Sequence, residues 1–86
     1  MDIKILKNVV TKKLTSGTVL LNLESGEYFT LNDTAAIIWQ GLVNKLPTDD
    51  IALAIEKEFE CSLQEAESDI EEYVEYLVDQ KLIKLE

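Results

Sequence analysis

The chain has 86 residues, of which 47% are hydrophobic and 29% are charged, a balance typical of one small globular domain. Seventeen acidic residues against eight lysines give a formal net charge of −9, and the sequence contains neither arginine nor histidine. Arginine is the residue best suited to binding phosphate and guanine, and histidine is the commonest general base, so this composition disfavours nucleic-acid binding and catalysis. The single cysteine, Cys61, excludes an internal disulfide framework and a cysteine-based metal cluster.

The sequence predicts neither a membrane protein nor a secreted one. No apolar run approaches the roughly 20 residues that a membrane-spanning helix requires. The N-terminal stretch MDIKILKNVV carries charges and lacks the unbroken apolar segment of a signal peptide. We therefore expect a cytoplasmic protein, with residues 1–86 forming a single domain.

The first third of the chain predicts three strands. A first strand, rich in β-branched residues, is expected somewhere in 3–14. Ser16-Gly17 is a turn signal, and a second strand is expected over 18–23. The Ser25-Gly26 turn leads to a third strand over 27–31, because glycine accepts the positive φ that tight hairpin turns need.

The second and third strands form a predicted hairpin with two apolar faces. A two-residue loop at Ser25-Gly26 places Leu21 opposite Thr30, whereas a longer loop shifts this register. Large apolar side chains occupy one face at Val19, Leu21, Leu23 and Tyr28, and the other face at Leu20, Phe29 and Leu31. A hairpin needs only one buried face, so the second face or the strand edge is expected to have another use.

The remainder of the chain predicts three helices with apolar stripes at helical spacing. Pro47 ends the first helix, and the third helix, over about 63–80, is the longest. The start signals are, in chain order, Asn32 or Asp33, then Thr48, then a capping box of Ser62 and Glu65. Strands followed by helices predict an α+β domain, in which a three-stranded antiparallel sheet precedes a three-helix bundle in a winged-helix-like arrangement.

Two functions of small acidic or winged-helix proteins fit poorly. Ser62 at a helix start invites comparison with acyl carrier proteins, but those are all-helical, and the capping role explains this serine without a cofactor. A winged-helix DNA binder needs basic residues on its recognition helix, whereas the helix over 63–80 carries seven acids and no base. We expect no catalytic residue, no cofactor, no metal site and no nucleic-acid partner.

The function that remains after these exclusions is binding of a partner through the backbone of a strand edge. The outer edge of the third strand presents N–H and C=O groups to which a peptide can add as a further strand. Alternatively, the tail over 82–85 or a neighbouring subunit covers that edge. The residues alone leave both interpretations open.

Several short motifs together resemble the PqqD-like family, the leader-peptide recognition elements of pathways that modify ribosomally made peptides. The resemblance runs from about residue 17 to residue 83, and its most specific part is the spacing between the motifs. They are Val19-Leu20-Leu21-Asn22, Ser25-Gly26-Glu27-Tyr28-Phe29, Leu31-Asn32-Asp33-Thr34 and Ile38-Trp39. This chain departs from the family in having Lys81 where a glycine is common, and Gly41 where a bulkier residue is usual.

The resemblance implies a peptide-binding site as well as a fold. In the family, the leader peptide adds along the third strand, and its apolar side chains enter a groove between that strand and the third helix. The residues that this implies for peptide binding are Glu27, Tyr28, Phe29, Thr30, Leu31, Asp69, Ile70, Tyr73, Val74, Tyr76 and Leu77. Ile70 and Leu77 are also the best core positions of the helix, so the sequence does not separate core residues from contact residues.

The motifs look closest to the small stand-alone leader-binding proteins of lasso-peptide clusters. This resemblance implies a non-enzymatic protein, a monomer or weak dimer, that binds a precursor leader peptide and delivers it to a leader peptidase or other maturation enzyme. The acidic third helix suits a leader that bears lysines. The alternatives are a chaperone for a radical-SAM or other peptide-modifying enzyme, and a winged-helix protein-interaction subunit.

Overall fold

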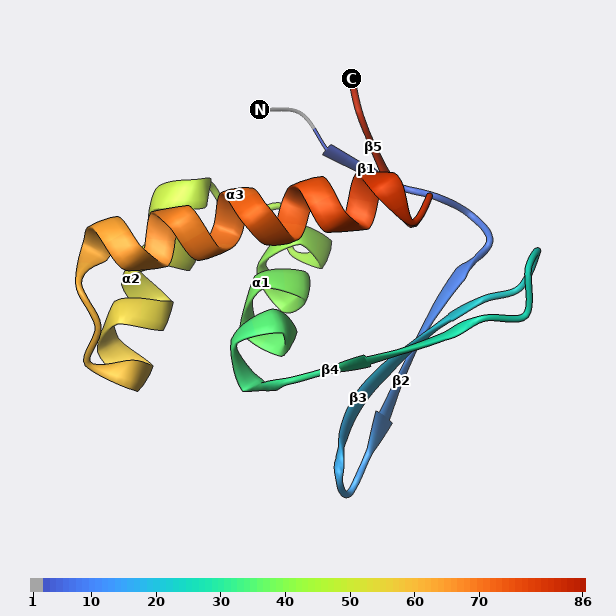
Figure 1. Ribbon diagram of the computed structural model, residues 1–86, viewed down its shortest axis with the longest axis horizontal. Helices are drawn as coiled ribbons and strands as arrows, with labels where there is room; N and C mark the ends of the chain where they lie inside the picture. The colour runs from blue at the N-terminus through green and yellow to red at the C-terminus, as the bar shows by residue number, and fades with distance from the viewer. Residues whose placement is uncertain (1–2) are drawn as a thin grey trace.

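The computed structural model describes residues 3–86 and has the predicted α+β order of strands followed by helices (Figure 1). Met1 and Asp2, which we expected to belong to the single domain, lie outside the described residues. The elements are β1 (Ile3–Ile5), β2 (Val9–Leu14), β3 (Gly17–Asn22), β4 (Tyr28–Leu31), α1 (Asp33–Val43), α2 (Thr48–Phe59), α3 (Leu63–Asp79) and β5 (Ile83–Leu85).

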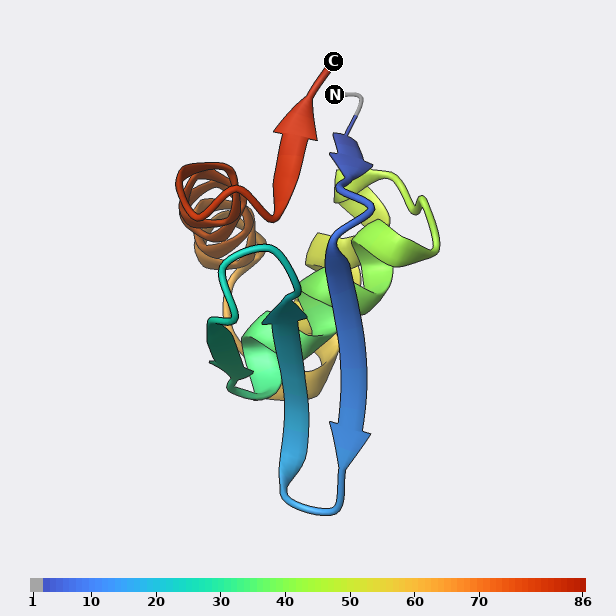
Figure 2. The same ribbon diagram turned by 90° about the vertical axis from the view of Figure 1, so that its right-hand side faces the viewer.

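The strands form two separate ladders. The predicted three-stranded antiparallel sheet is present, with the order β2-β3-β4. The first strand expected in 3–14 is in fact two strands, because β1 leaves the sheet and pairs antiparallel with β5, Ile3 opposite Leu85. Figure 2 shows this small ladder beside the two chain ends, away from the long β2–β3 hairpin. The tail therefore pairs with β1 and does not cover β4.

The hairpin between β3 and β4 has a longer loop than the two-residue one considered above. Leu21 lies opposite Tyr28, not Thr30. The reason is the side chain of Asn22, whose Oδ1 accepts from the backbone N–H of Glu24 at 2.9 Å and of Ser25 at 3.3 Å. Gly26 N–H also donates to the backbone carbonyl of Asn22 at 2.7 Å. Together these bonds satisfy the loop amides, and the loop spans residues 23–26.

One face of the hairpin packs on the helices and the other does not. The core consists of apolar side chains from β3, β4, all three helices and the tail: Leu20, Phe29, Leu31, Ala35, Ile38, Trp39, Leu42, Ile51, Ala52, Ile55, Ala66, Ile70, Val74, Leu77, Leu82 and Ile83. Trp39 Nε1 donates to Thr11 Oγ1 at 2.9 Å, which ties α1 to β2. On the opposite face, Tyr28 is 72% exposed.

The helix ends follow local capping chemistry with two differences from the sequence prediction. Asn32 caps α1 by accepting from Ala35 N–H at 2.8 Å, and Ser62 caps α3 by accepting from Glu65 N–H at 3.1 Å. Thr48 was expected to cap α2, but it is the first helical residue, and Pro47 holds the cap position without a side-chain bond. The first helix ends at Val43, before Pro47, since residues 44–46 already leave the helix.

Gly41 allows α1 and α2 to approach closely. A Cβ atom added at Gly41 would lie 2.5 Å from Cγ1 and 2.7 Å from Cδ1 of the buried Ile51. Non-bonded carbon atoms normally lie 3.5–4.0 Å apart, so a side chain at this position would displace Ile51 within the core. The glycine is therefore a packing requirement, which explains its presence inside a helix despite its low helix propensity.

We expect Gly41→Ala to lower the free energy of unfolding by about 1–3 kcal/mol, because overpacking outweighs the gain of about 1 kcal/mol in helix propensity. Urea unfolding followed by circular dichroism measures this change. The same substitution in an Ile51→Ala background should be neutral or stabilising, since the clashing atoms are gone. Equal destabilisation in both backgrounds would show that the contact with Ile51 is not the cause.

Candidate functional site: the edge groove beside β4

The outer edge of β4 has no strand partner among residues 3–86. Asn22 N–H donates to the carbonyl of Glu27 at 2.9 Å, and backbone groups alternate direction along an antiparallel strand. Residues 27, 29 and 31 therefore point their backbone groups toward β3, whereas Tyr28 and Thr30 point theirs away from the sheet. On the other side of β3, Leu23 N–H donates to the carbonyl of Asn8, which fits the same alternation. The free edge thus offers the N–H and C=O of two residues to an additional strand.

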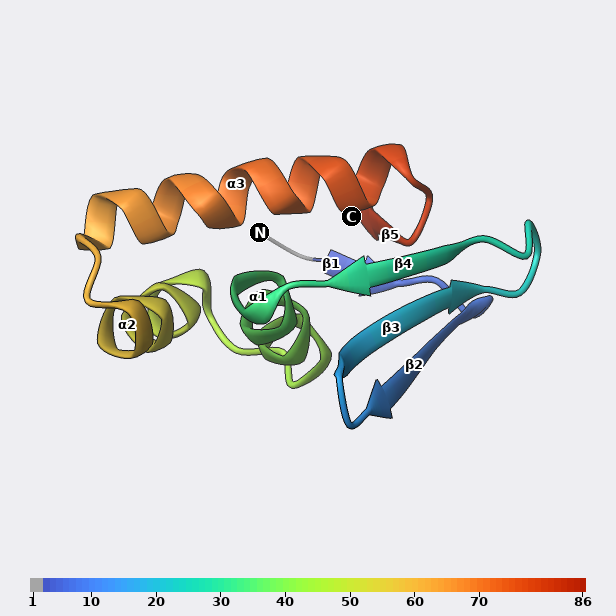
Figure 3. The ribbon, with the colours of Figure 1, turned by 60° about the horizontal axis from the view of Figure 1, so that its bottom comes forward.

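A groove runs between this free edge, the start of α1 and the middle of α3. Figure 3 shows how these three elements are arranged. The groove consists of two adjoining hollows, of about 260 Å³ beside β4 and about 390 Å³ beside α1. We call it the edge groove, and its lining residues are Phe29, Thr30, Leu31, Asn32, Thr34, Ala35, Ile38, Asp69, Glu72, Tyr73 and Tyr76.

Three aromatic rings connect β4 to α3 in the edge groove. Phe29 and Tyr76 meet edge to face with ring centroids 6.5 Å apart, and Tyr76 stacks on Tyr73 at 5.8 Å. Such pairs are worth about 0.5–1.5 kcal/mol beyond their buried area. The Phe29–Tyr76 pair joins strand to helix, whereas the Tyr73–Tyr76 pair lies within α3. Phe29 is buried, whereas Tyr76 is 43% exposed and presents part of its ring to the groove.

The hydroxyl of Tyr73 is buried and lacks a hydrogen-bond partner within the part of the chain that the structure describes. Burial, and secondarily the neighbouring Tyr76, raises the pKa of Tyr73 from 10.0 to about 12. A buried hydroxyl without a partner costs about 1–3 kcal/mol in stability. Such unpaired buried groups are rare in native structures. Tyr73 lines the edge groove with the accessible part of its side chain, while the hydroxyl itself is covered.

We expect Tyr73→Phe to raise the free energy of unfolding at pH 7 by up to about 1 kcal/mol, because it removes an unpaired buried hydroxyl. The raised pKa of Tyr73 also means that the folded state holds this proton more tightly than the unfolded state does. The stabilisation of the folded state that results from this difference in pKa is complete below pH 10. It is lost as the pH rises from 10 to about 12.

Urea titrations of wild type and Tyr73→Phe at pH 7 and pH 10.5 test both effects. The stability difference between the two proteins should shift further in favour of the phenylalanine variant at the higher pH. Tyr76→Phe is the matched control, since the Tyr76 side chain is partly exposed, and it should change stability little. A loss of stability in Tyr73→Phe at pH 7 would show that the hydroxyl is satisfied in solution.

One end of the edge groove is acidic. Asp69 and Glu72 project from α3 beside the first turn of α1, and both side chains are exposed. No lysine lines either hollow of the groove. The negative potential at this end favours a cationic group over an anionic one.

The expected peptide-binding residues fall into separate places. Tyr28 and Thr30 direct their backbones to the free edge, while Asp69, Tyr73 and Tyr76 line the edge groove together with Phe29 and Leu31. Glu27 precedes β4, and its carbonyl is bonded to Asn22. Ile70 and Val74 line a different hollow, on the other side of α3, and Leu77 is fully buried.

The sequence prediction omitted five residues that line the edge groove: Asn32, Thr34, Ala35, Ile38 and Glu72. Four of them belong to the cap and first turns of α1, which begins directly after β4. The capping residue Asn32 directly follows the last strand residue, Leu31, in the sequence. This order predicts that the first turns of α1 lie beside the end of β4. In the described part of the chain, no group of three or more His, Cys, Asp or Glu side chains is arranged to hold a metal ion.

A family comparison identifies this architecture. The family described as coenzyme PQQ synthesis protein D (PqqD) matches residues 17–83. The chain belongs to the PqqD family. The resemblance seen in the strand, turn and helix motifs is thereby confirmed, and this PqqD-family protein has the expected order of a three-stranded sheet and three helices.

Two solved structures are similar to this PqqD-family protein over nearly its whole length. One is a lasso peptide synthetase B1 complexed with the leader peptide, with a TM-score of 0.91, 32% identity, and coverage of 99% of this chain and 100% of that chain. The other is TbiB1 in complex with the TbiA(beta) leader peptide, with a TM-score of 0.85, 28% identity and 94% coverage of each chain. A search of curated protein sequences found no significant match. Over residues 3–86, no helix has the length and apolar character needed to cross a membrane.

Proposed function

We propose that this protein binds the leader peptide of a ribosomally made precursor as an additional strand on β4 and delivers it to a maturation enzyme. The observation that carries the proposal is the free β4 edge, with the backbone groups of Tyr28 and Thr30 directed outward beside the edge groove. Strand addition obtains affinity from main-chain hydrogen bonds and specificity from pockets for alternate side chains. Both elements lie side by side here, and the two similar structures are leader-peptide complexes.

In this proposal, apolar leader side chains enter the edge groove. Phe29, Tyr73 and Tyr76 provide its aromatic surface. A leader lysine lies near Asp69 and Glu72, where charge complementarity favours it. Ile70, Val74 and Leu77 serve as the packed support of α3, since all three are buried.

Delivery is the second part of the proposal. A protein that holds a leader by one strand edge leaves the rest of the precursor free for a separate enzyme, which we take to be a leader peptidase in a lasso-peptide pathway. A domain that binds the precursor and the enzyme at the same time raises the effective concentration of the precursor at the enzyme. The protein itself performs no chemical step in this account.

A titration tests the first part directly. The gene neighbourhood of this protein is searched for a short precursor gene, and the leader it encodes is labelled with fluorescein. The labelled leader is titrated with the protein, and anisotropy reports binding. We expect saturable binding with a Kd below about 100 μM, equivalent to more than about 5 kcal/mol. A scrambled leader of equal composition is the control. Absence of saturation, or equal binding of the scrambled peptide, refutes leader recognition.

Delivery is tested by cleavage. The purified leader peptidase of the same gene cluster is assayed on its precursor with and without this protein. We expect the protein to lower the KM for the precursor, because it concentrates the substrate at the enzyme. Cleavage at the same rate and the same KM in its absence refutes delivery while leaving leader binding intact.

A further inference from the structure

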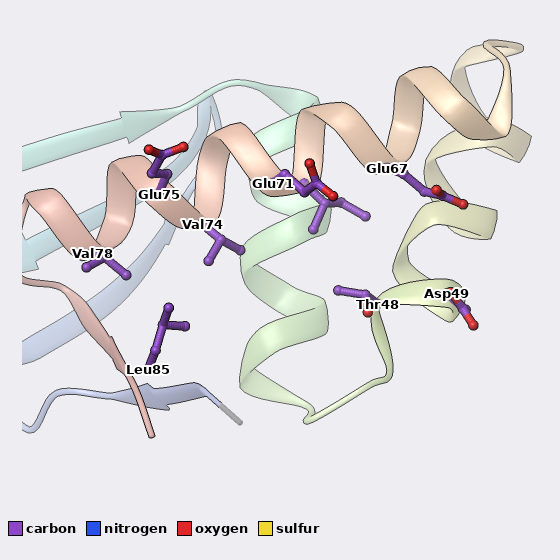
Figure 4. A pocket seen from close by; sticks show the side chains of 9 residues that line it. Thr48, Asp49, Glu67, Glu71, Val74, Glu75, Val78 and Leu85 are labelled. Atoms are coloured by element: carbon purple, nitrogen blue, oxygen red, sulfur yellow. The ribbon is translucent and has the colours of Figure 1, made fainter. Parts of the chain in front are cut away.

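A second groove lies on the other side of α3 from the edge groove. It has a volume of about 360 Å³ and is bounded by α3, the start of α2 and β5 (Figure 4). We call it the α3–β5 groove. Its lining residues are Thr48, Asp49, Glu67, Ile70, Glu71, Val74, Glu75, Val78 and Leu85.

The α3–β5 groove and the edge groove share no lining residue. Successive turns of α3 contribute Asp69, Glu72, Tyr73 and Tyr76 to one side, and Glu67, Ile70, Glu71, Val74, Glu75 and Val78 to the other. The two grooves therefore lie on opposite flanks of one helix. An occupant of one leaves the other accessible.

The base of the α3–β5 groove is apolar. Val74, Val78 and Leu85 direct their side chains toward the same space between α3 and β5 (Figure 4). Leu85 is 54% exposed although it belongs to a strand. Val74 is only 4% exposed, so the accessible apolar surface of this base comes from Val78 and Leu85.

The rim of the groove is acidic throughout. Asp49 lies at one end, and Glu67, Glu71 and Glu75 follow one another at intervals of four residues along α3. Like charges at this spacing destabilise a helix by about 0.2–0.5 kcal/mol per pair, and no lysine lines the groove to offset them. A row of three carboxylates extends about 12 Å along the helix, which matches cationic side chains spaced along a protein segment better than one small cation.

We propose that the α3–β5 groove docks an apolar segment of the maturation enzyme that bears lysine or arginine side chains. Its apolar residues cover Val78 and Leu85, and its cations pair with the glutamate row. The leader then occupies the edge groove while the enzyme holds the opposite flank of α3, so binding of one does not compete with binding of the other. This inference rests on the proposed function, because it takes the maturation enzyme as the occupant.

The experiment measures two affinities for each protein variant. The leader peptidase of the same gene cluster is immobilised, and binding of this protein is followed by biolayer interferometry; leader binding is followed in parallel by anisotropy. The double variant Glu71→Lys/Glu75→Lys is expected to bind the peptidase at least about tenfold more weakly than wild type. Substitution of residues at the centre of an interface commonly has an effect of this size. Its affinity for the leader should stay within about twofold of wild type, since neither residue lines the edge groove.

The matched control carries the same charge change elsewhere. Glu58→Lys/Glu60→Lys also raises the net charge by four, at exposed positions that line neither groove. Glu60 has φ 53, and the chain already places lysine in this left-handed conformation at Lys45 and Lys81, so the control is expected to fold. It should bind the peptidase within about twofold of wild type, because distant sites act independently.

A second variant separates the apolar base from the charged rim. Leu85→Ser is expected to weaken peptidase binding about fivefold without changing its salt dependence, whereas the glutamate variant should show weaker salt dependence than wild type. Circular dichroism checks that each variant is folded. Glu67→Gln/Glu71→Gln/Glu75→Gln replaces the lysine variant if the latter unfolds.

The outcomes are distinct. Absence of leader binding by wild type refutes the proposed function. Normal leader binding combined with an unchanged peptidase affinity of Glu71→Lys/Glu75→Lys, or with an equal loss in the control, overturns only the present inference. A wild-type dimer in sedimentation that the same substitution dissociates also overturns it, because the occupant would then be a second copy of this chain.

Discussion

Thr30→Pro is expected to weaken leader binding at least about tenfold while leaving the domain folded. The N–H of Thr30 points away from β3, so proline removes a donor from the free edge and not from the β3–β4 ladder. A backbone hydrogen bond is worth about 0.5–1.5 kcal/mol net, and the proline ring additionally obstructs the approach of a strand. Anisotropy with the labelled leader measures the effect.

Thr30→Val is the matched control for the proline variant. It retains the N–H, the β-branched shape and the strand propensity of threonine, so leader affinity should stay within about twofold of wild type. Unchanged affinity of a folded Thr30→Pro variant would show that the β4 edge is not the binding site. The thermal unfolding midpoint of each variant establishes that it is folded.

The leader side of the same contact provides a test that leaves the protein unaltered. A strand added to β4 directs every second N–H toward it. Single N-methyl groups placed along the leader should therefore weaken binding with a period of two residues over the part that pairs with Tyr28 and Thr30. A uniform effect, or a period of three to four residues, would indicate that the leader binds as something other than a strand.

The features that the sequence predicted well depend on near neighbours in the chain. The faces of the hairpin follow from strict alternation, so Leu20, Phe29 and Leu31 were assigned to one face, and all three are buried. The cap at Ser62 is a local motif, and its bond to Glu65 N–H is present. Such patterns specify a conformation before tertiary contacts form.

The features that were not predicted, or that were left open, depend on contacts that hydrophobic periodicity does not encode. The split of the first strand follows from its pairing with β5, whose residues come some 80 positions later. The loop between β3 and β4 is longer than two residues because Asn22 holds its amides, and Asn22 itself is held by the side chain of Asn8. Periodicity contains no information about either contact.

The division of α3 between two grooves could not be derived from its sequence for a related reason. Ile70, Val74 and Tyr73 belong to one apolar stripe, and only the rotation of the helix about its axis decides which flank faces β4. That rotation is fixed by packing against α1, α2 and β5 together. As a result Tyr73 faces the edge groove, whereas Ile70 and Val74 face the α3–β5 groove.

Tyr76→Ala should weaken leader binding by at least about tenfold, because tyrosines at the centre of an interface are commonly residues whose truncation costs 2 kcal/mol or more. Tyr76 contacts both Phe29 and Tyr73, so its ring joins the strand side of the edge groove to the helix side. Removing it widens the groove and removes the aromatic surface that apolar leader side chains would cover. Isothermal titration with the leader measures the loss, together with a smaller negative heat-capacity change, since less apolar area is buried.

Tyr28→Ala is the matched control, because it makes the same substitution in a residue whose backbone lies on the free edge. Its side chain is 72% exposed and does not line the edge groove, while alanine retains the N–H and C=O that the leader would use. Its leader affinity should remain within about threefold of wild type, a change below about 1 kcal/mol. If Tyr28→Ala loses as much affinity as Tyr76→Ala, the leader side chains lie on the outer face of the sheet, and the edge groove is not their site.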